Sequence, residues 1–590
     1  MRETARMGRA RIHSVAGRLR RLPAALRSVP PATLRRALTR SGLDEFEAWI
    51  VLGFAAAFAA LLILVESRSN AFFNDEIAIF QQLGEGIDVR SILEPHNGHL
   101  ILPAHLVYAA IFSWVGPSYT AFRVLGVLVL VTCAVLFYVL ARRRMGPTVA
   151  LVPAIVLLFL GSAWEALLWP LTMLTFGLSV AFGLGALVAL DRDDARGDVA
   201  ACALTVLAVV SHSTGLAFLV GVAVAVIMGG RGRRRAWVFA VPLAVYAAWW
   251  VWALRFHEGL AHPGNLLIVP AFMADSLAAV SAAVTGLGLD LGGGPVSLTV
   301  SPSWGYVIAP IAALAFAVRL SRGRIPPFVW IAVGILVAYW LELALGFAPE
   351  GRAPTESRYL FPGAVLVLLV AAAALAGARI SRRAAVAIVA VGAVGVLANV
   401  KQLDNAQRFF SDYAPRARAA LGAIEIAGGS VSPDYRPEAQ PGLGGSVPAH
   451  FPVQAGPYLQ AVHRFGSYAF SGTELLQQDA AIRESADRVL ASAERLALRP
   501  SGGASAGRCR EPSAEGAAVR ELHPGTVSLR ASAPARVRLG RFAEGYPVDL
   551  GELRPGRPVT LSIPRDADAR PWRIEIGGGT STRICLPSTS

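Results

Sequence analysis

The feature that most constrains this fold is a series of apolar runs between Trp49 and Val400, each of roughly 15–21 residues. A helix needs about 20 apolar residues to cross the hydrocarbon core of a bilayer, and somewhat fewer where the bilayer thins. The runs therefore predict eleven membrane-spanning helices. They lie at 48–66, 121–140, 147–163, 171–190, 199–212, 213–229, 236–254, 303–320, 327–347, 360–377 and 384–400.

The placement of arginine supports this count. All of the 55 basic residues except Lys401 are Arg, and basic residues are enriched in the cytoplasmic loops of membrane proteins. With eleven spans, the basic tail and four short basic links fall on one side, which is therefore the cytoplasmic side. The first loop and the C-terminus then face outward. The links are Arg142–Arg144, Arg231–Arg235, Arg319–Arg324 and Arg379–Arg383.

Two other apolar segments are excluded from the spans. If 100–114 crossed the membrane, Arg142–Arg144 would face outward, so we interpret 100–114 as a helix lying on the outer surface. Segment 266–287 carries Asp275 and is expected at the same interface. The sequence thus predicts a multi-pass protein of the cell membrane with a cytoplasmic N-terminus.

Four regions follow from this topology. Residues 1–47 form a basic cytoplasmic tail, expected to contact anionic lipid head groups and not nucleic acid. Residues 48–400 form the transmembrane domain, with an outer loop at 67–120. Residues 401–510 are predicted as an extracytoplasmic linker and helical region. Residues 511–590 contain short alternating strands such as "TVSLRAS" and "WRIEIG", which predict a small β-sandwich.

The fold class is therefore an all-α polytopic membrane domain followed by an extracytoplasmic α+β region. Cys509 and Cys585 bracket the predicted sandwich in a compartment where disulfides persist, so we predict that they are bonded. Cys133 and Cys202 lie in predicted spans and are interpreted as packing residues.

Candidate functional residues gather at the predicted outer ends of the spans. Polar residues near lipid are costly, so those that are retained are candidates for function. The candidates are Asp75, Glu76, His96, His99, Glu165, His212, Arg352, Arg358 and Tyr359.

Several of these residues leave alternatives open. Asp75 and Glu76 suit a general base beside a membrane cavity, or form an ordinary solvated pair. His96 and His99, with Glu94 as a third ligand, would suit a divalent metal, but two histidines without a further ligand favour phosphate contact or hydrogen bonding.

The remaining candidates have similar pairs of readings. His212 is either a ligand contact or a satisfied interior histidine. Arg352 and Arg358 suit a lipid-linked phosphate, which Arg binds bidentately, or are plain loop residues. Glu165, between "GSAW" and "ALLW", has little structural reason to sit in such an apolar setting.

The sequence resembles the GT-C superfamily of membrane glycosyltransferases over about residues 1–400. The resembling segments are "FFNDE" at 72–76, "EPHNGHLILPAHLVY" at 94–108, "WEALLW" at 164–169 and "SRYLFPG" at 357–363. The resemblance implies a polyprenyl-phosphate sugar as donor substrate and no certain cofactor. It also implies that Asp75 is the base toward the acceptor hydroxyl, with Glu76 as second candidate, and that the donor phosphate lies near Arg352, Arg358 or His99.

The function expected from this resemblance is transfer of a hexose or pentose, with inversion, to a cell-envelope glycan or protein on the outer face. The expected partners are the lipid-linked donor, the envelope acceptor and membrane lipids. A transporter of lipid-linked sugars is one alternative, although no inverted repeat is evident and the mid-span charges that a coupling ion needs are missing. A non-enzymatic envelope assembly protein is the other, and the clustering of polar residues on one face argues against it.

Overall fold

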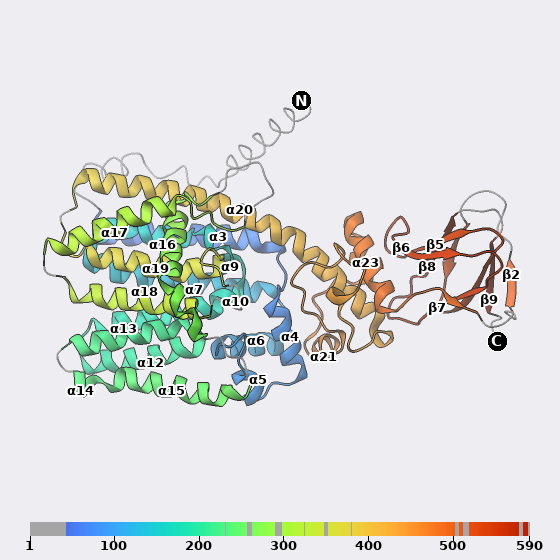
Figure 1. Cartoon of the computed structure of the whole chain (residues 1–590), viewed down its shortest axis with the longest axis horizontal. Coiled ribbons are helices and arrows are strands. Elements are labelled where there is room, and N and C mark those ends of the chain that lie inside the picture. Colours follow the sequence, from blue (N-terminus) through green and yellow to red (C-terminus); the bar gives the residue numbers. More distant parts are fainter. Residues whose placement is uncertain are drawn as a thin grey trace, which may run out of the picture.

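The computed structural model describes residues 43–587, except for 230–231, 257–261, 290–297, 324, 347–351, 379, 502–506, 511–517 and 578–581. A large helical part is joined to a smaller β part at the far end of an elongated molecule (Figure 1). The predicted basic tail lies almost wholly outside the described residues, as do Arg231, Arg324 and Arg379.

Helices lie at all eleven predicted spans, and the predicted helical membrane fold is confirmed. Among the described residues, nine helical segments are long and apolar enough to cross a membrane, and eight of them coincide with predicted spans. The helices at 199–212, 213–229 and 303–320 are not among the nine, so the count of eleven stays a prediction. The helices at the predicted spans are α3 (Glu45–Glu66), α7 (Tyr119–Met145), α8 (Pro147–Leu158), α11 (Leu178–Leu190), α12 (Ala195–Ser211), α13 (Thr214–Met228), α15 (Trp237–Ala253), α17 (Gly305–Ser321), α18 (Pro327–Leu345), α19 (Ser357–Ala374) and α20 (Arg382–Ala427). The α8 run continues through η3 (Gly161–Ala163) and α9 (Trp164–Leu168), and α11 is preceded by α10 (Pro170–Thr172) and η4 (Met173–Gly177).

The segment Pro263–Thr285, which contains η6 (Pro263–Ile268) and α16 (Val269–Thr285), is one of the nine by length and composition. Its first residues lie at the end of α18, where the Asn265 side chain donates a hydrogen bond to the Leu345 carbonyl at 3.0 Å. At its other end, the Ala283 carbonyl accepts a hydrogen bond from Asn399 at 2.8 Å. Leu345 and Asn399 lie at the ends of two predicted spans, 327–347 and 384–400, and both ends are on the predicted outer side. Helix α16 runs across its neighbours (Figure 1). The contacts therefore favour the interfacial placement expected for this segment.

The first predicted outer loop folds into three short helices, α4 (Asp75–Glu85), α5 (Val89–Leu93) and α6 (Leu102–Trp114). Helix α6 has 13 residues and is about 20 Å long at 1.5 Å per residue, which is too short to cross a bilayer. Its apolar side chains include Trp114, which is 85% exposed. A short apolar helix with one face buried and with Leu106 and Trp114 exposed fits the predicted position at the membrane surface.

Helix α20 carries the chain from the membrane part into the C-terminal region. It has 46 residues and continues without a break through the predicted boundary at residue 400. Beyond it, α21 (Ala455–Phe465) packs so closely on α4 that a Cβ at Gly84 would lie 2.4 Å from the Ala461 side chain. The Gln81 side chain also donates to the Pro452 carbonyl and accepts from the Gln454 N–H, both at 2.8 Å. The C-terminal region is thus docked on the helix that begins with Asp75.

The C-terminal β part consists of two antiparallel sheets, as predicted. One sheet has the order β1-β7-β4-β9-β2 and the other β3-β8-β5-β6. The strands are β1 (Arg499–Pro500), β2 (Gly507–Arg510), β3 (Ala518–Leu522), β4 (Gly525–Ala531), β5 (Ala535–Gly540), β6 (Val548–Leu553), β7 (Val559–Ile563), β8 (Trp572–Gly577) and β9 (Thr582–Pro587). Asp487, on α23 (Ala480–Ala493), accepts three backbone hydrogen bonds from residues 541–543 and so joins the helical region to the sheets.

The register of β2 and β9 bears on the predicted disulfide. Cys509 and Cys585 are directly opposed backbone partners on these neighbouring strands. Their side chains lie outside the described part of the structure, so the disulfide stays a prediction. Cys133 and Cys202 are buried free cysteines.

Candidate functional site

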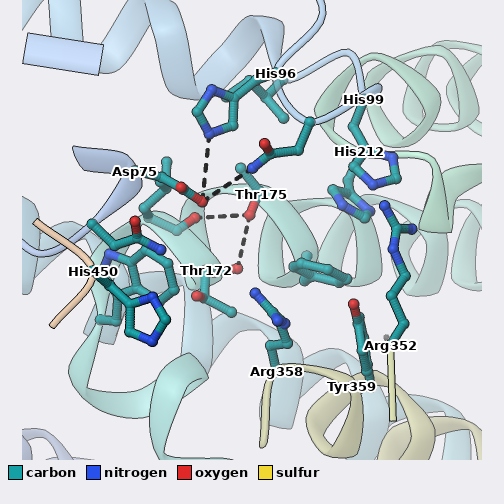
Figure 2. Close-up of a pocket in the computed structure, with 16 residues that line it drawn as sticks. Asp75, His96, His99, Thr172, Thr175, His212, Arg352, Arg358, Tyr359 and His450 are labelled. Carbon is teal, nitrogen blue, oxygen red and sulfur yellow. Dashed lines mark hydrogen bonds and ion pairs between the residues drawn. The ribbon is translucent and has the colours of Figure 1, made fainter. Parts of the chain in front are cut away.

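A cavity of about 710 Å³ opens at the end of the helical part that the arginine pattern predicts to face outward. It collects side chains from the first loop, the segment around η4, the start of α19 and the C-terminal region (Figure 2). Seven of the nine functional candidates line it. Its lining residues are Asn74, Asp75, His96, Asn97, His99, Ile101, Trp169, Leu171, Thr172, Thr175, Phe176, His212, Arg352, Arg358, Tyr359 and His450.

Asp75 is the only acidic residue in this lining. It is the first residue of α4, and Asn74 before it adopts a positive φ of 43° that turns the chain into the helix. One Asp75 oxygen accepts a hydrogen bond from the Asn97 amide at 3.3 Å and lies 3.5 Å from Nε2 of His96. Burial opposes ionisation, but His96, the charge of Arg358 and the Asn97 bond outweigh it, so the pKa of Asp75 is lowered. Asp75 is therefore ionised at neutral pH.

A tight hairpin places the two histidines of the first loop. His96 and His99 exchange backbone hydrogen bonds of 2.9 and 3.0 Å, and only Asn97 and Gly98 lie between them. Both of these residues have positive φ, at 50° and 77°, as a type I′ turn requires. Within this hairpin, Asn97 and His96 both reach Asp75 (Figure 2). Asn–Gly is a strong sequence signal for such a turn, so Asn97 could have been identified from the sequence.

His99 faces a different wall of the cavity. Its Nδ1 lies 2.8 Å from the Ser213 hydroxyl, and its ring centroid lies 4.3 Å from that of His212. Burial, with a smaller contribution from the charge of Arg352, lowers the pKa of His99 to about 3. His99 is thus neutral at physiological pH and offers a hydrogen bond instead of a positive charge.

The positive charge of the cavity comes from two arginines. Arg358 lies in the first turn of α19, and its Nε donates to Glu356 at 2.8 Å. Arg352 has no carboxylate within ion-pair distance among the residues that the structure describes. The side chains of both arginines extend toward the cavity on the side opposite Asp75 (Figure 2).

Glu165 lies behind the cavity wall and holds the start of α19. One of its oxygens accepts hydrogen bonds from the Ser357 hydroxyl at 2.7 Å and from the Arg358 N–H at 2.9 Å. The first N–H groups of a helix have no partners within the helix, so a carboxylate here satisfies one of them and complements the helix dipole. The structure therefore places Glu165 behind Arg358 and outside the lining itself.

Glu76 also points away from the cavity. It is fully buried, accepts a hydrogen bond from the Tyr108 hydroxyl at 2.6 Å and another from the Phe73 N–H at 3.0 Å. Burial raises the pKa of Glu76 to about 8 despite these two bonds. Two adjacent carboxyls thus differ in charge, because Asp75 is ionised at neutral pH while Glu76 is mostly protonated.

Other lining residues were not among the sequence candidates. Thr172, Thr175 and Phe176 lie in an apolar run whose composition gives no functional signal. His450 belongs to the C-terminal region, with a positive φ of 58°, and only the docking of that region brings it to the cavity. Within the described residues, no group of three His, Cys, Asp or Glu side chains could hold a metal ion.

Comparisons with known proteins give one distant structural match. No protein-family model and no curated protein matches the chain. Among solved structures, the chain is similar to ArnT from Cupriavidus metallidurans bound to undecaprenyl phosphate, with 14% sequence identity and a TM-score of 0.41. The match covers 65% of this chain and 81% of that one.

Proposed function

We propose that this protein is a membrane glycosyltransferase that moves a sugar from a polyprenyl-phosphate donor to a hydroxyl group of a cell-envelope glycan or protein on the outer face. One observation carries the proposal. A single cavity at one end of an apolar helical bundle holds an ionised carboxylate, Asp75, opposite two arginines, Arg352 and Arg358 (Figure 2). This is the pairing that transfer from a lipid phosphate requires, namely a base for the acceptor and cations for the leaving group.

In the proposed reaction, the acceptor hydroxyl lies against Asp75 and the donor phosphate against the two arginines. Asp75 takes the hydroxyl proton as the hydroxyl oxygen attacks the anomeric carbon of the donor. The bond from that carbon to the phosphate oxygen breaks, and the lipid phosphate leaves with the electron pair. Attack opposite the leaving group inverts the anomeric carbon. The negative charge that develops on the phosphate is stabilised by Arg352 and Arg358.

The remaining candidates support these groups. We assign His96 and Asn97 to holding Asp75 ionised and oriented, because both contact the same carboxylate oxygen. Neutral His99 offers a hydrogen bond to a phosphate or sugar oxygen. Glu76, with its raised pKa, is the weaker candidate for the base, and we assign it to fixing the start of α4 through Phe73 and Tyr108.

The first test is lipid binding. The purified protein in lipid nanodiscs is titrated with undecaprenyl phosphate and the bound lipid is counted by native mass spectrometry. Arg352→Ala and Arg358→Ala should each weaken binding about 10- to 100-fold, since each removes a charge-assisted hydrogen bond worth about 1.5–3 kcal/mol. Arg255→Ala is the control, because Arg255 lies against Trp252 at the end of α15 and does not line the cavity. If the unaltered protein binds no lipid phosphate, the envelope-assembly function becomes the better explanation.

A further inference from the structure

A second cavity, of about 460 Å³, lies between α20 and the loop 437–449. From α20 it is lined by Phe409, Asp412, Tyr413 and Arg416, whose spacing of three, four and seven residues places them on one face of the helix. The volume falls within the range of about 300–1,000 Å³ typical of small-molecule sites. The loop contributes Pro437, Glu438, Leu443, Gly444, Gly445, Val447, Pro448 and Ala449.

Aromatic rings and a few polar groups converge in this second cavity. Arg416 donates a hydrogen bond to Asp412 at 2.8 Å and another to the Gly445 carbonyl at 3.4 Å, so it ties the loop to the helix. Glu438 adds a second carboxylate. The Tyr413 side chain is 3% exposed, and its hydroxyl lies toward the backbone of Asn74, beside the first cavity. The second cavity thus sets carboxylates and a guanidinium beside aromatic rings.

The second cavity is separated from the first by a thin wall. The Tyr413 ring packs against Phe73 with centroids 4.8 Å apart, and Phe73 packs in turn against Trp169, which lines the first cavity, at 5.0 Å. The loop bridges the two cavities as well, because Ala449 lines the second and His450 the first. A molecule that occupies the second cavity is therefore close to Asn74 and Asp75.

The charges of the two cavities select different ligands. The first presents Arg352 and Arg358 and suits a phosphate, whereas the second presents two carboxylates against the single guanidinium of Arg416 and disfavours an anion. Carboxylates accept hydrogen bonds from neighbouring hydroxyl groups, and aromatic faces pack against apolar C–H surfaces. A neutral saccharide combines these two features.

We infer that the cavity lined by Phe409, Asp412, Tyr413, Arg416 and Glu438 binds a neutral saccharide, which is the acceptor of the transfer. Binding there would hold one unit of an acceptor glycan beside the wall that separates it from Asp75, with a neighbouring unit of the same glycan in reach of the first cavity. The identification of this saccharide as the acceptor rests on the proposed function, whereas the saccharide site itself does not.

The test uses the full-length protein in nanodiscs and a panel of neutral trisaccharides, namely maltotriose, mannotriose, galactotriose and arabinotriose. Binding is measured by saturation-transfer NMR, with competition to obtain affinities. Asp412→Asn and Glu438→Gln alter exposed side chains, so both variants should fold. Asp404→Asn is the matched control, because Asp404 is an acid on the same helix that pairs with Lys401 and Arg408 outside the cavity.

At least one trisaccharide should bind, about tenfold more weakly to Asp412→Asn and Glu438→Gln, since each removes a charged acceptor. Binding to Asp404→Asn should match that of the unaltered protein. The inference is overturned if no trisaccharide binds, or if both cavity variants bind as the control does. Undecaprenyl phosphate is titrated into the same preparations. If the protein binds a saccharide but no undecaprenyl phosphate, the saccharide site is supported and the proposed glycosyl transfer is overturned.

Discussion

The carboxylate of Glu165 accepts a hydrogen bond from the backbone N–H of Arg358 at 2.9 Å. The two residues are 193 positions apart in sequence, and the contact fixes the start of α19 against α9. An acid outside the cavity thus determines where a cationic side chain of the cavity lies. In the proposed function, this contact would set how accurately Arg358 is presented to the donor phosphate.

Replacing Glu165 should therefore weaken lipid binding indirectly. Glu165→Ala removes the hydrogen bonds to Ser357 and Arg358, and we expect undecaprenyl phosphate to bind about three- to tenfold more weakly. The loss should be smaller than in Arg358→Ala. Glu85→Ala, at the exposed end of α4, serves as control. A variant that melts earlier but binds the lipid with unchanged affinity would assign Glu165 to stability alone.

The lowered pKa of Asp75 predicts the acid side of the pH–rate profile. A base must be ionised, so activity should persist above the pKa of Asp75 and fall as the pH drops through it. In the unaltered protein this fall should occur below the usual Asp range. His96→Ala removes a contact that lowers this pKa, so the fall should move to higher pH. His463→Ala, an exposed histidine on α21, should leave the profile in place.

Glu76 should make stability depend on pH. Its pKa is about 8 in the folded protein and near 4.5 when exposed, so between these values the folded state holds the extra proton. Stability from this group is therefore fully present below about pH 4.5 and is lost as the pH rises toward 8. Glu76→Gln cannot titrate, and its melting temperature in nanodiscs should fall less over that interval than that of the unaltered protein. Parallel curves for the two proteins would contradict the raised pKa.

The sequence predicted the helices and the main site residues for separate physical reasons. Hydropathy locates spans because lipid demands long apolar helices, and the arginine pattern then brings Asp75, His99 and Arg358 to one end of the bundle. Length alone could not distinguish α16 from a span, since its placement depends on contacts with Leu345 and Asn399.

Roles that depend on contacts between residues far apart in the chain could not be predicted from the sequence. Nothing near Glu165 indicates a partner at Ser357, and His450 reaches the cavity only because α21 docks on α4. The different protonation of Asp75 and Glu76 has the same origin. Neighbouring carboxyls point to opposite sides of the start of α4, one to a polar cavity and the other to the core.

The pairing of Cys509 with Cys585 can be tested directly. The two residues oppose each other on β2 and β9, and a bond between them would close a loop of about 77 residues, worth roughly 4 kcal/mol in the chain-entropy treatment. Non-reducing peptide mapping of protein from an oxidising compartment should recover the two peptides linked. Cys133 and Cys202 should be recovered as free thiols in the same experiment. Recovery of Cys509 and Cys585 as free thiols would refute the bond.

The final prediction separates the base from the phosphate site. Asp75→Asn keeps the size of the side chain but cannot accept a proton at neutral pH, and general-base catalysis typically contributes about 10²–10⁴-fold. This variant should fold and bind undecaprenyl phosphate normally, yet lose about that factor in kcat. Arg358→Ala should instead show its defect mainly in the KM for the donor, with a smaller loss in kcat from weaker stabilisation of the leaving phosphate. Release of polyprenyl phosphate from a panel of polyprenyl-phosphate sugars, with the envelope fraction as acceptor, measures both quantities. Transfer at the unaltered rate in Asp75→Asn and in the double variant with Glu76→Gln would exclude both carboxyls as the base.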